Sequence, residues 1–405
     1  MDYWFGRPAC WVLTTVFKLK RIFVKKNRIE HTRKILFIKL FGIGSIVLAL
    51  PAIKALEEDY PDSEIFFLTF KGNEEILRLT GVVDEKNIFT VRTGRITLLI
   101  RDLLTCVPLL VKEKIDIAID MEFFSRFTAI LSFFIRSRYR IGFYGFHTEG
   151  LKRGSFINFP IQYNHTIHTA RAFFTLLKPL GITGEKFNPT PPQIPASVNF
   201  HEKIIEILSE VTPTADLSAL RKWMIINPNT SDLIELRKWP ESNFSEVANY
   251  LLEQFKDLGV IFIGSPSESK VVESIMGMMQ SDNLKRTFNT LGKTSIRDLL
   301  DLFYFAELFL TNDSGPAHLA SLTNIPMVVL FGPETPDLYA PLGNRARCLY
   351  LGLDCQPCVS TFNAKRSFCQ ENICLQEITP EKVGELCFEM ITSSSKTREF
   401  ETEAR

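Results

Sequence analysis

The stretch from Phe309 to Gly332, FLTNDSGPAHLASLTNIPMVVLFG, holds two apolar runs separated by a polar turn and a short helical pattern. This arrangement predicts a strand, a tight turn, a short helix and a second strand. Asp313 or Ser314 would cap the helix, and Pro316 suits its first turn. Free backbone N–H groups and the helix dipole would make this N-terminus a site for an anion such as a diphosphate. An ordinary capped helix in an α/β domain is the alternative interpretation.

The composition indicates a soluble globular protein. The chain has 405 residues, enough for two domains with separate cores, and 45% of them are hydrophobic and 23% charged. The net charge of +1 gives no overall field that would favour nucleic acid. No apolar run reaches the ~20 residues that span a bilayer, and the N-terminus lacks a signal-peptide layout. We therefore expect a cytoplasmic protein whose cysteines are reduced.

The first 30 residues are aromatic and basic. If residues 11–25 form a helix, one face is apolar and the opposite face carries Lys18, Arg21 and Lys25. The apolar positions are Val12, Val16, Leu19 and Phe23. A basic amphipathic helix is typical of an element that binds the membrane surface. The alternative is a helix that packs its apolar stripe on the first domain and leaves its basic face in solvent.

Residues 34–39, KILFIK, predict a strand that runs into a glycine turn and then a helix. The turn contains Gly42, Gly44 and Ser45. It is not the dinucleotide-binding fingerprint, because the third glycine position holds Val47. The two glycines would let a ligand or a facing domain approach the backbone closely.

Strand and helix patterns alternate from residue 64 to residue 142, which predicts a parallel sheet with helices on both faces. Ligands bind at the carboxyl ends of the strands in such sheets. Asp120 and Glu122 follow one predicted strand, so we expect their carboxylates to point toward a ligand. A solvated helix cap is the alternative role for Glu122.

Two consecutive motifs carry a resemblance to a known family. D-S-G-P-x-H-L-A at residues 313–320 and P-x-V-x-L-F-G-P at residues 326–333 resemble the donor-site signature of glycosyltransferase family 9. This family comprises the bacterial lipopolysaccharide heptosyltransferases and their relatives. The resemblance extends from about residue 33 to about residue 383. It implies an α/β fold of the GT-B architecture, in which two Rossmann-like domains with parallel sheets face one another across a cleft.

The resemblance also implies a reaction. The first domain would bind the acceptor and the second a nucleotide-sugar, with inverting transfer of a heptose-like sugar from a nucleotide-diphosphate donor. An ADP-sugar is the favoured donor, and the acceptor would be a lipopolysaccharide core or another lipid-linked glycan. This chemistry requires no cofactor and no metal. A lipid-linked acceptor also favours attachment of the N-terminal segment to the inner face of the cytoplasmic membrane.

One position departs from the family pattern. Related sequences carry an acid, proposed as the general base, where this chain has Ser45. A serine hydroxyl cannot accept a proton near neutral pH without help, so Glu122 is the substitute candidate for the base. Two other functions stay open: a non-catalytic family member that binds nucleotide or glycan, and a nicotinamide oxidoreductase, which only the Rossmann-like patterning suggests.

The candidates for donor binding follow predicted strands of the second domain. Arg237 matches the basic position of the family, two residues before Trp239 and Pro240, and a guanidinium can pair with a diphosphate in bidentate fashion. Lys238 is a second candidate cation, although the two could equally form a surface pair. Glu268 matches an acid that contacts the donor nucleotide, or it is a first-turn acid favoured by the helix dipole.

The remaining donor-side candidates lie on two strand-end loops. The first loop carries Asn229 and Thr230, and the second carries Ser314, Gly315 and Pro316. The diphosphate would leave toward Ser314 and Gly315. Asp313 would cap the helix or hold a sugar hydroxyl. His318 would hydrogen-bond the loop, or it is a histidine satisfied in the core.

Four cysteines suggest a possible metal site. Cys355, Cys358, Cys369 and Cys374 have the C-x2-C and C-x4-C spacing of a tetrahedral zinc site, but no histidine supports it. Reduced thiols are the alternative. Separately, His165 and His168 favour ordinary helix-surface roles, because no third ligand is evident.

The expected domain organisation has six parts. These are a basic amphipathic segment (1–30), an acceptor domain (31–186), a linker region (187–222), a donor domain (223–378), a C-terminal helix (379–392) and a disordered tail (393–405).

Overall fold

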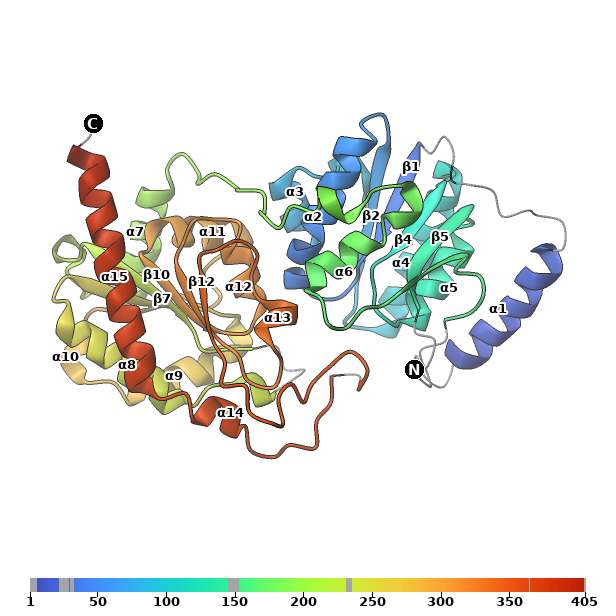
Figure 1. Ribbon diagram of the computed structural model, residues 1–405. Helices are drawn as coiled ribbons and strands as arrows, with labels where there is room; N and C mark the ends of the chain where they lie inside the picture. Colours follow the sequence, from blue (N-terminus) through green and yellow to red (C-terminus); the bar gives the residue numbers. More distant parts are fainter. Residues whose placement is uncertain are drawn as a thin grey trace. The chain divides into compact units, whose positions relative to one another are not determined.

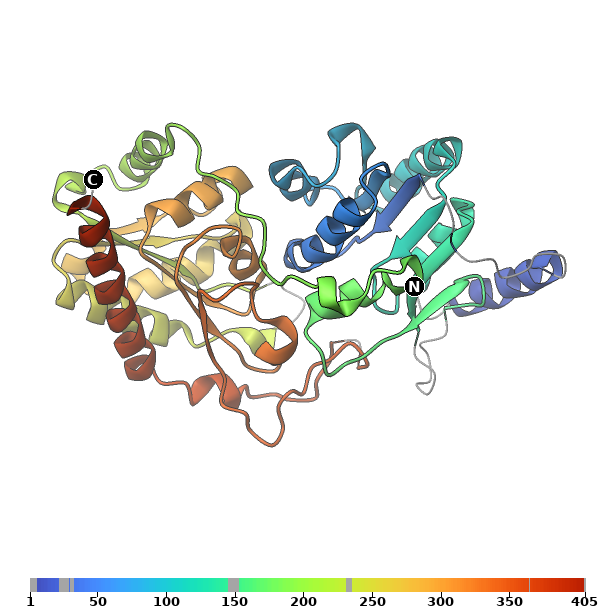
Figure 2. The same ribbon diagram turned by 45° about the horizontal axis from the view of Figure 1, so that its top comes forward.

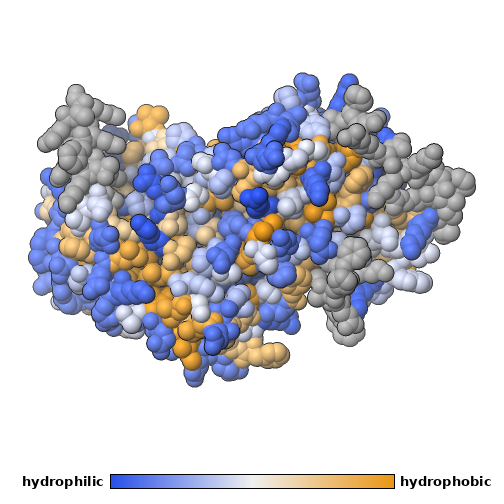
Figure 3. Space-filling model, in the orientation of Figure 1, coloured by the Kyte–Doolittle hydropathy of each residue, from blue (hydrophilic) through white to orange (hydrophobic). Residues whose placement is uncertain are grey.

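The computed structural model describes residues 6–21, 29, 33–144, 153–230, 235–363 and 365–403. The chain divides into two compact units, Met1–Thr190 and Pro191–Arg405 (Figure 1). None of the described helices combines the length and the hydropathy needed to cross a membrane. On the side drawn in Figure 3, hydrophilic residues dominate and hydrophobic residues occur in separate groups.

The first unit contains a six-stranded sheet in the order β3-β2-β1-β4-β5-β6, and its neighbouring strands are parallel. The strand order reverses direction beside β1, as in doubly wound Rossmann-like folds. The strands are β1 (Lys34–Ile38), β2 (Glu64–Phe70), β3 (Ile88–Val91), β4 (Ile117–Asp120), β5 (Tyr139–Tyr144) and β6 (Phe159–Gln162).

Helices cover both faces of this sheet (Figures 1 and 2). On one face α2 packs against α6 and α3, and on the other face α4 packs against α5. An additional helix, α1, packs against α5. The bounds are α1 (Gly6–Arg21), α2 (Ile43–Asp59), α3 (Glu74–Thr80), α4 (Ile96–Glu113), α5 (Arg126–Phe134) and α6 (Thr169–Thr175), with 3-10 turns η1 (Glu85–Asn87), η2 (Lys178–Leu180) and η3 (Gly184–Lys186).

The second unit repeats the same plan. Its six strands are ordered β12-β11-β10-β7-β8-β9, and neighbouring strands are again parallel. The strands are β7 (Lys222–Asn227), β8 (Leu258–Phe262), β9 (Thr287–Asn289), β10 (Leu308–Asn312), β11 (Met327–Leu330) and β12 (Ala346–Leu349).

Helix α7 precedes these strands, the other helices of the second unit lie between and after them, and α15 packs along α8. They are α7 (Phe200–Val211), α8 (Glu241–Gln254), α9 (Ser269–Gly277), α10 (Ser281–Leu284), α11 (Ile296–Phe305), α12 (Gly315–Ala320), α13 (Pro336–Tyr339), α14 (Ile373–Gln376) and α15 (Pro380–Glu403). The 3-10 turns are η4 (Leu217–Ala219), η5 (Glu235–Arg237) and η6 (Pro266–Glu268).

The central strands are apolar on both faces because helices bury both sides of each sheet. In the second unit, side chains of β7, β8, β10 and β11 form one core with α8 and α15. Trp239 belongs to this core, and its indole N–H donates to the carbonyl of Ile378, 2.8 Å away. The loop before α8 is thereby attached to the segment that leads into α15.

The structure confirms the elements predicted for residues 309–332. Strand β10 ends at Asn312, Ser314 is the N-cap of α12, Pro316 lies in its first turn, and β11 follows. The two parallel α/β sheets confirm the predicted fold class. The predicted arrangement of the two domains across a cleft stays a prediction.

The N-terminal helix differs from its prediction. It begins at Gly6 rather than near residue 11, and residues 22–28 lie outside the described part of the chain. Cys10, Leu13 and Phe17 pack in a cluster with α5, whereas Val12 and Val16 are exposed. Residues 10, 13 and 17 form a stripe at helical spacing on the other side of the helix, and this stripe matches the apolar surface of α5.

Two segments outside the sheets also differ. The region expected as a linker, residues 187–222, contains α7, which packs on α11 of the second unit. The tail from residue 393, predicted to be disordered, continues as part of α15 to Glu403. The tail sequence has Lys, Arg and Glu in high proportion, and these residues are good helix formers.

The packing of β8 leads to a stability prediction. A Cβ added at Gly259 would overlap the Trp223 ring, which is buried between Phe288 and Phe305. We expect Gly259→Ala to lower the free energy of unfolding by about 1–3 kcal/mol, because the ring would have to leave its packing against Phe288 and Phe305. Urea unfolding followed by circular dichroism measures this change.

Gly277 supplies the matched control. It lies at the end of α9, and a Cβ there would meet nothing within 4 Å. Gly277→Ala should be neutral or slightly stabilising, since alanine favours helix more than glycine does. Equal effects of the two substitutions would contradict this account of the strand packing.

Candidate functional site

Four neighbouring strands of the second unit, β11, β10, β7 and β8, end at the same edge of the sheet. Most of the donor-side candidates follow these carboxyl ends. The amide of Asn227 joins two of the strand ends, because it donates to Thr311 Oγ1 and Ser314 Oγ, each 3.2 Å away. Asn312 makes a second connection through a 2.8 Å bond from its amide to the carbonyl of Pro228. These bonds fix the loops after β7 and β10 relative to each other.

Arg237 lies between two buried carboxyl groups. Its Nη1 is 3.4 Å from Asp313 Oδ2 and 3.4 Å from Glu334 Oε2, and it also donates to the carbonyl of Asp313. Lys365 Nζ contacts the other oxygen of Glu334 at 2.9 Å. Asp313 and Glu334 are nearly inaccessible to solvent. The cluster therefore concentrates two cations and two carboxyl groups at the ends of β10 and β11.

The two carboxyls of this cluster titrate differently. Burial, followed by the neighbouring Glu334, raises the pKa of Asp313 to about 7. Burial acts in the same direction on Glu334, but Lys365 and Arg237 outweigh it and lower the pKa of Glu334 below its usual range. The two groups also hydrogen-bond each other. Asp313 thus holds the proton that the pair shares.

Beside the cluster, three buried polar atoms have no hydrogen-bond partner among the described residues. They are Asn229 Nδ2, Thr230 Oγ1 and Arg237 Nε. Buried polar groups are nearly always hydrogen-bonded, so unpartnered donors gathered at one strand edge indicate a ligand that supplies the acceptors. Asn229 and Thr230 are each less than 5% exposed.

The first loop after β8 completes this edge. A Cβ at Gly264 would lie 2.8 Å from Asn229 Nδ2, 3.1 Å from Glu268 Oε2 and 3.3 Å from Leu291. Only a residue without a side chain fits between these groups. Glu268 also closes a capping box, because its Oε2 accepts from the Ser265 backbone N–H at 2.7 Å. Both interpretations of Glu268 are therefore compatible with its position: it caps its own turn and lies beside Asn229.

The remaining donor-side candidates are less distinctive. Gly315 and Pro316 form the first turn of α12 and are partly exposed, while His318 is buried within that helix. Lys238 contacts Glu235 at 4.0 Å and is about one-third exposed. The structure thus brings Arg237, Asn229, Thr230, Asp313 and Ser314 to one edge and gives Lys238 the surroundings of a surface residue.

In the first unit, Glu122 organises the glycine turn. Its Oε1 accepts hydrogen bonds from Lys39 Nζ at 2.9 Å and from the backbone N–H groups of Leu40 and Phe41 at 2.8 and 2.9 Å. The strands β1 and β4 are neighbours, so these residues meet at their carboxyl ends. Glu122 is buried and is therefore not the solvated helix cap that the sequence left open.

Gly42 and Ser45 lie directly beyond this anchored turn. Gly42 is the N-cap of α2 with a φ of 80°, a left-handed conformation that favours glycine. A Cβ at Gly42 would lie 3.4 Å from Ser45 Oγ, while Gly44 is buried in the first turn. The hydroxyl of Ser45 therefore lies at the carboxyl end of β1, beside the turn that Glu122 holds.

A second buried ion pair involves Asp120, two residues before Glu122. Asp120 is paired with Arg153, whose guanidinium also contacts Thr128 Oγ1 at 3.1 Å and the carbonyl of Ser125 at 2.9 Å. Burial raises the pKa of Asp120 to about 6, although Arg153 opposes this shift. Both residues are fully buried, so this pair supports the loops after β4 and β5 rather than contacting a ligand.

The cysteine cluster does not form a metal site in the described part of the chain, where no three His, Cys, Asp or Glu side chains gather suitably. Cys355 and Cys369 are exposed, while Cys374 is buried, and all are free thiols. Burial, together with the neighbouring cysteines, raises the pKa of the Cys374 thiol to about 11. The zinc alternative therefore gains no support.

His168, one of the two histidines near the start of α6, caps this helix by accepting a hydrogen bond from the backbone N–H of Ala170.

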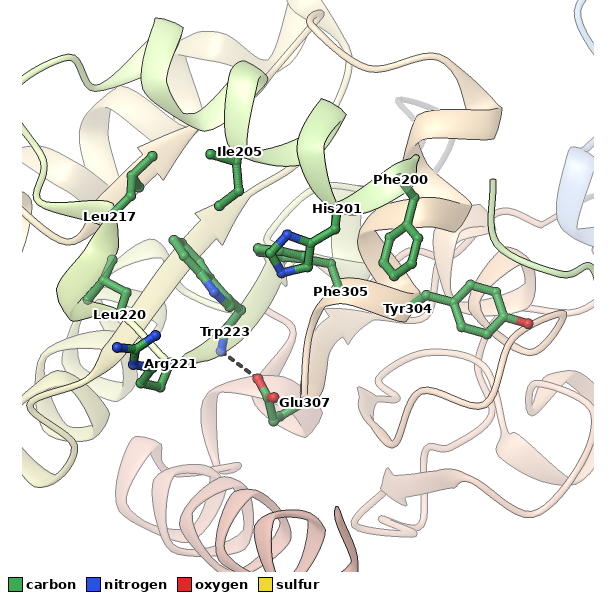
Figure 4. Close-up of a pocket in the computed structure, with 10 residues that line it drawn as sticks. All are labelled: Phe200, His201, Ile205, Leu217, Leu220, Arg221, Trp223, Tyr304, Phe305 and Glu307. Carbon is green, nitrogen blue, oxygen red and sulfur yellow. Dashed lines mark hydrogen bonds between the residues drawn. The ribbon is translucent and has the colours of Figure 1, made fainter. Parts of the chain in front are cut away.

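A cavity of about 460 Å³ lies elsewhere in the second unit. Figure 4 shows that Trp223, Phe305 and His201 surround it, and that Glu307 accepts from the backbone N–H of Trp223, 2.5 Å away. His201 lies on α7, whereas Trp223, Phe305 and Glu307 lie at the amino ends of β7 and β10, the opposite edge of the sheet from Arg237 and Asp313. The cavity is therefore separate from the candidate donor site.

Comparison with known proteins decides the family. The sequence profile of glycosyltransferase family 9 (heptosyltransferase) matches residues 109–367, more than half of the chain. The chain belongs to glycosyltransferase family 9. This membership gives no support to the nicotinamide oxidoreductase alternative.

Named relatives of this family 9 protein agree with the profile. Lipooligosaccharide heptosyltransferase 2 of Campylobacter jejuni is 31% identical over 176 residues, 43% of this chain and 52% of the relative. The chain spans about half the length of the first two curated relatives it matches. Lipopolysaccharide core heptosyltransferase OpsX of Haemophilus influenzae is 24% identical over 78% of this chain and 83% of its own length.

A solved structure confirms the fold of the family 9 protein. The Escherichia coli ADP-heptose lipopolysaccharide heptosyltransferase II superimposes with a TM-score of 0.69 at 20% identity. The superposition covers 89% of this chain and 99% of that structure.

Sequence reasoning missed three residues of this family 9 site. Glu334 and Lys365 complete the charge cluster around Arg237, and Lys39 pairs with Glu122. Glu334 directly follows the F-G-P end of the quoted motif, so its place after a strand was an available signal. Lys365 lies in an irregular segment with no such signal.

The charge cluster predicts a pH dependence of stability. Asp313 has a folded-state pKa of about 7 against an ordinary value of 3.8, so the folded protein binds this proton more tightly than the unfolded chain. The stabilising contribution is therefore complete at low pH and is lost as the pH rises through about 7.

Asp313→Asn should remove this dependence, because the amide resembles the protonated acid and does not titrate. Relative to the wild type, the variant should gain on the order of 1 kcal/mol or more of unfolding free energy between about pH 5.5 and pH 8.5. Denaturant unfolding of both proteins across this range measures the difference. Parallel curves would contradict the assignment of the proton to Asp313.

Proposed function

We propose that this protein transfers a heptose-like sugar, with inversion, from an ADP-linked donor to a lipopolysaccharide-core or other lipid-linked glycan acceptor. The observation that carries the proposal is the group of unpartnered, buried polar atoms on Asn229, Thr230 and Arg237, beside a cationic cluster, in a member of glycosyltransferase family 9. The relatives reported above are named as heptosyltransferases of lipooligosaccharide or lipopolysaccharide. No metal or cofactor takes part in the proposed reaction.

The charge balance of the cluster suits a diphosphate. With its proton in place, Asp313 is neutral, so Arg237 and Lys365 are opposed only by Glu334. One net positive charge is then available at the strand edge. Arg237 Nε would donate to a phosphate oxygen, and Ser314 and Gly315 would lie toward the same group. Glu268, beside Asn229, would bind the nucleotide ribose. The E. coli structure, whose name specifies ADP-heptose, supports an adenine nucleotide.

This arrangement would stabilise the departing nucleotide. In an inverting transfer, the acceptor oxygen attacks the anomeric carbon and the bond to the diphosphate breaks, so negative charge grows on the leaving phosphate. Donors fixed in advance by a protein cost no reorganisation at that moment, and they commonly supply the largest part of the rate. The contacts of Arg237 with Asp313 and Glu334 hold its guanidinium in place before a donor arrives.

Removal of the acceptor proton is assigned to the first unit. Glu122 is the candidate general base because Ser45 occupies the position where the family carries an acid. Its Oε1 already accepts three hydrogen bonds, which leaves Oε2 as the oxygen that could take a proton. Gly42 and Gly44 would let the acceptor approach the turn that Glu122 anchors. The acceptor would reach the protein at the inner face of the cytoplasmic membrane.

Donor identity is tested by thermal unfolding with ADP, UDP, GDP, CDP and NAD in separate samples. A ligand at about a hundred times its dissociation constant adds about 2.7 kcal/mol to the native state. We expect a shift with ADP that is lost in Arg237→Ala and kept in Lys285→Ala, whose exposed side chain only pairs with Asp282. A shift with another nucleotide alone would reject the ADP donor. No shift with any nucleotide would reject the donor site.

The general base is tested by Glu122→Gln. We expect the kcat to fall by about 10²–10⁴-fold, the usual contribution of general base catalysis, with unchanged ADP binding. Because the substitution also disturbs the anchored turn, Ser45→Asp is the companion variant. It restores the acid of the family and should recover much of the turnover in the Glu122→Gln background.

Three outcomes separate the remaining alternatives. Full activity of Glu122→Gln would remove Glu122 as the base. Loss of activity without rescue by Ser45→Asp would leave Glu122 with only its role in positioning the turn. Nucleotide binding without turnover in the wild type, followed by turnover in Ser45→Asp, would identify a non-catalytic member of the family.

A further inference from the structure

We propose that the outward face of α4, together with the neighbouring α1, is a docking surface for an anionic lipid bilayer. The apolar part of this surface consists of Ile96, Ile100, Leu104 and Leu109 on α4 and Trp11, Val12 and Val16 on α1. All of it lies within the first unit. The inference does not rest on the proposed reaction, because it concerns where the protein binds and not what it transfers.

Helix α4 carries more apolar surface than its packing uses. Leu99, Leu103 and Leu110 face the core of the first unit, as expected for a helix that covers a sheet. On the adjoining side of the helix, about 100° around from Leu99 and Leu103, Ile100 is 50% exposed and Leu104 is 72% exposed. Residues 96, 100 and 104 are spaced by four, so they form one continuous stripe along the helix. Contiguous exposed apolar surface of this kind marks a binding surface more often than isolated residues do.

Helix α1 also carries exposed apolar residues in addition to those that pack against the first unit. Its inner stripe, which includes Cys10 and Phe17, packs on α5, while Trp11 is 73% exposed on the outside. Val12 and Val16 are exposed as well. Because α1 packs on α5 and α5 packs on α4, the three helices are described together as one layer. An exposed Phe134 at the end of α5 belongs to this layer. Tryptophan is the residue most typical of the boundary between lipid and water.

The charges on this layer have one sign. The exposed charged residues on and directly beside the described parts of these helices are all basic: Arg7, Lys18, Arg95, Arg101, Lys112, Lys114 and Arg136. The two acidic residues of the three helices, as far as the structure describes them, are Asp102 and Glu113. Asp102 forms an ion pair with Arg92, with a shortest distance of 2.6 Å, and Glu113 forms one with Lys34 at 2.6 Å. The layer therefore presents positive charge around apolar stripes.

This combination favours a bilayer over a second copy of the chain. Two copies joined through this face would bring their basic residues together, which is unfavourable. Anionic lipid headgroups instead complement these charges, and the apolar side chains can enter the boundary between headgroups and acyl chains. The long Arg and Lys side chains can reach headgroup phosphates while their aliphatic parts lie along the apolar surface.

The test is co-sedimentation of the full chain with vesicles of phosphatidylcholine, with or without about one third phosphatidylglycerol. The wild type should bind the anionic vesicles, and less so as salt is raised. The double variant Ile100→Glu with Leu104→Glu should reduce the partition coefficient at least tenfold. The matched control is Met278→Glu with Phe368→Glu, which changes two exposed apolar residues of the second unit and should bind as the wild type does.

Two further measurements test whether each variant folds and whether this face joins two copies of the chain. Circular dichroism establishes that each variant folds, and Arg95→Glu with Arg101→Glu tests the same surface through charge if the apolar variant does not fold. Sedimentation velocity without vesicles establishes whether this face joins two copies instead. Unchanged vesicle binding by the α4 variants would overturn the proposal. An equal loss of vesicle binding in the control variant, or no vesicle binding by the wild type, would also overturn it. So would a dimer of the wild type in solution that Leu104→Glu dissociates.

Discussion

Arg237 lies between two carboxyl groups that are almost completely buried, and the candidate donor site depends on this contact. A lone carboxylate at such a depth would be strongly disfavoured, and two would repel each other. The arrangement becomes stable because Arg237 and Lys365 compensate Glu334, and because Asp313 keeps a proton to a pH of about 7. The same balance leaves one positive charge for a ligand. Stability and the proposed binding of a diphosphate therefore depend on the same set of interactions.

The first unit also has buried carboxylates at strand ends, but their ion pairs have a different role. Glu122 is compensated by Lys39 and by two backbone N–H groups, so its charge is used to fix the turn between β1 and α2. Asp120, directly behind it, is paired with Arg153. Breaking such pairs usually costs several kcal/mol because one charge would stay buried alone. Both units thus use buried ion pairs at strand ends, and among the described residues the pairs around Arg237 adjoin polar atoms without a hydrogen-bond partner.

Much of the fold followed from periodicity, because parallel strands buried on both faces read as continuous apolar runs. The glycine turn, the strand-end position of Asp313 and the basic residue before Trp239 were likewise visible in the sequence. The partners of those residues were not. Glu334 reaches Arg237 because β11, β10 and β7 are neighbours in the sheet. Local sequence patterns do not predict the order of strands in a sheet. The packed face of α1 was mispredicted for a related reason, since two apolar stripes fit the same helix.

Helix α1 shows how tertiary packing selects one of two apolar stripes on the same helix. A basic amphipathic element was expected in the first 30 residues, yet the stripe that packs there is the one through Cys10 and Phe17. The apolar residues left outside form one layer with the exposed stripe of α4, more than 80 residues further along the chain. Tertiary packing decides which of several apolar faces stays exposed. The proposed docking surface therefore depends on the packing of the three helices and not on the N-terminal segment alone.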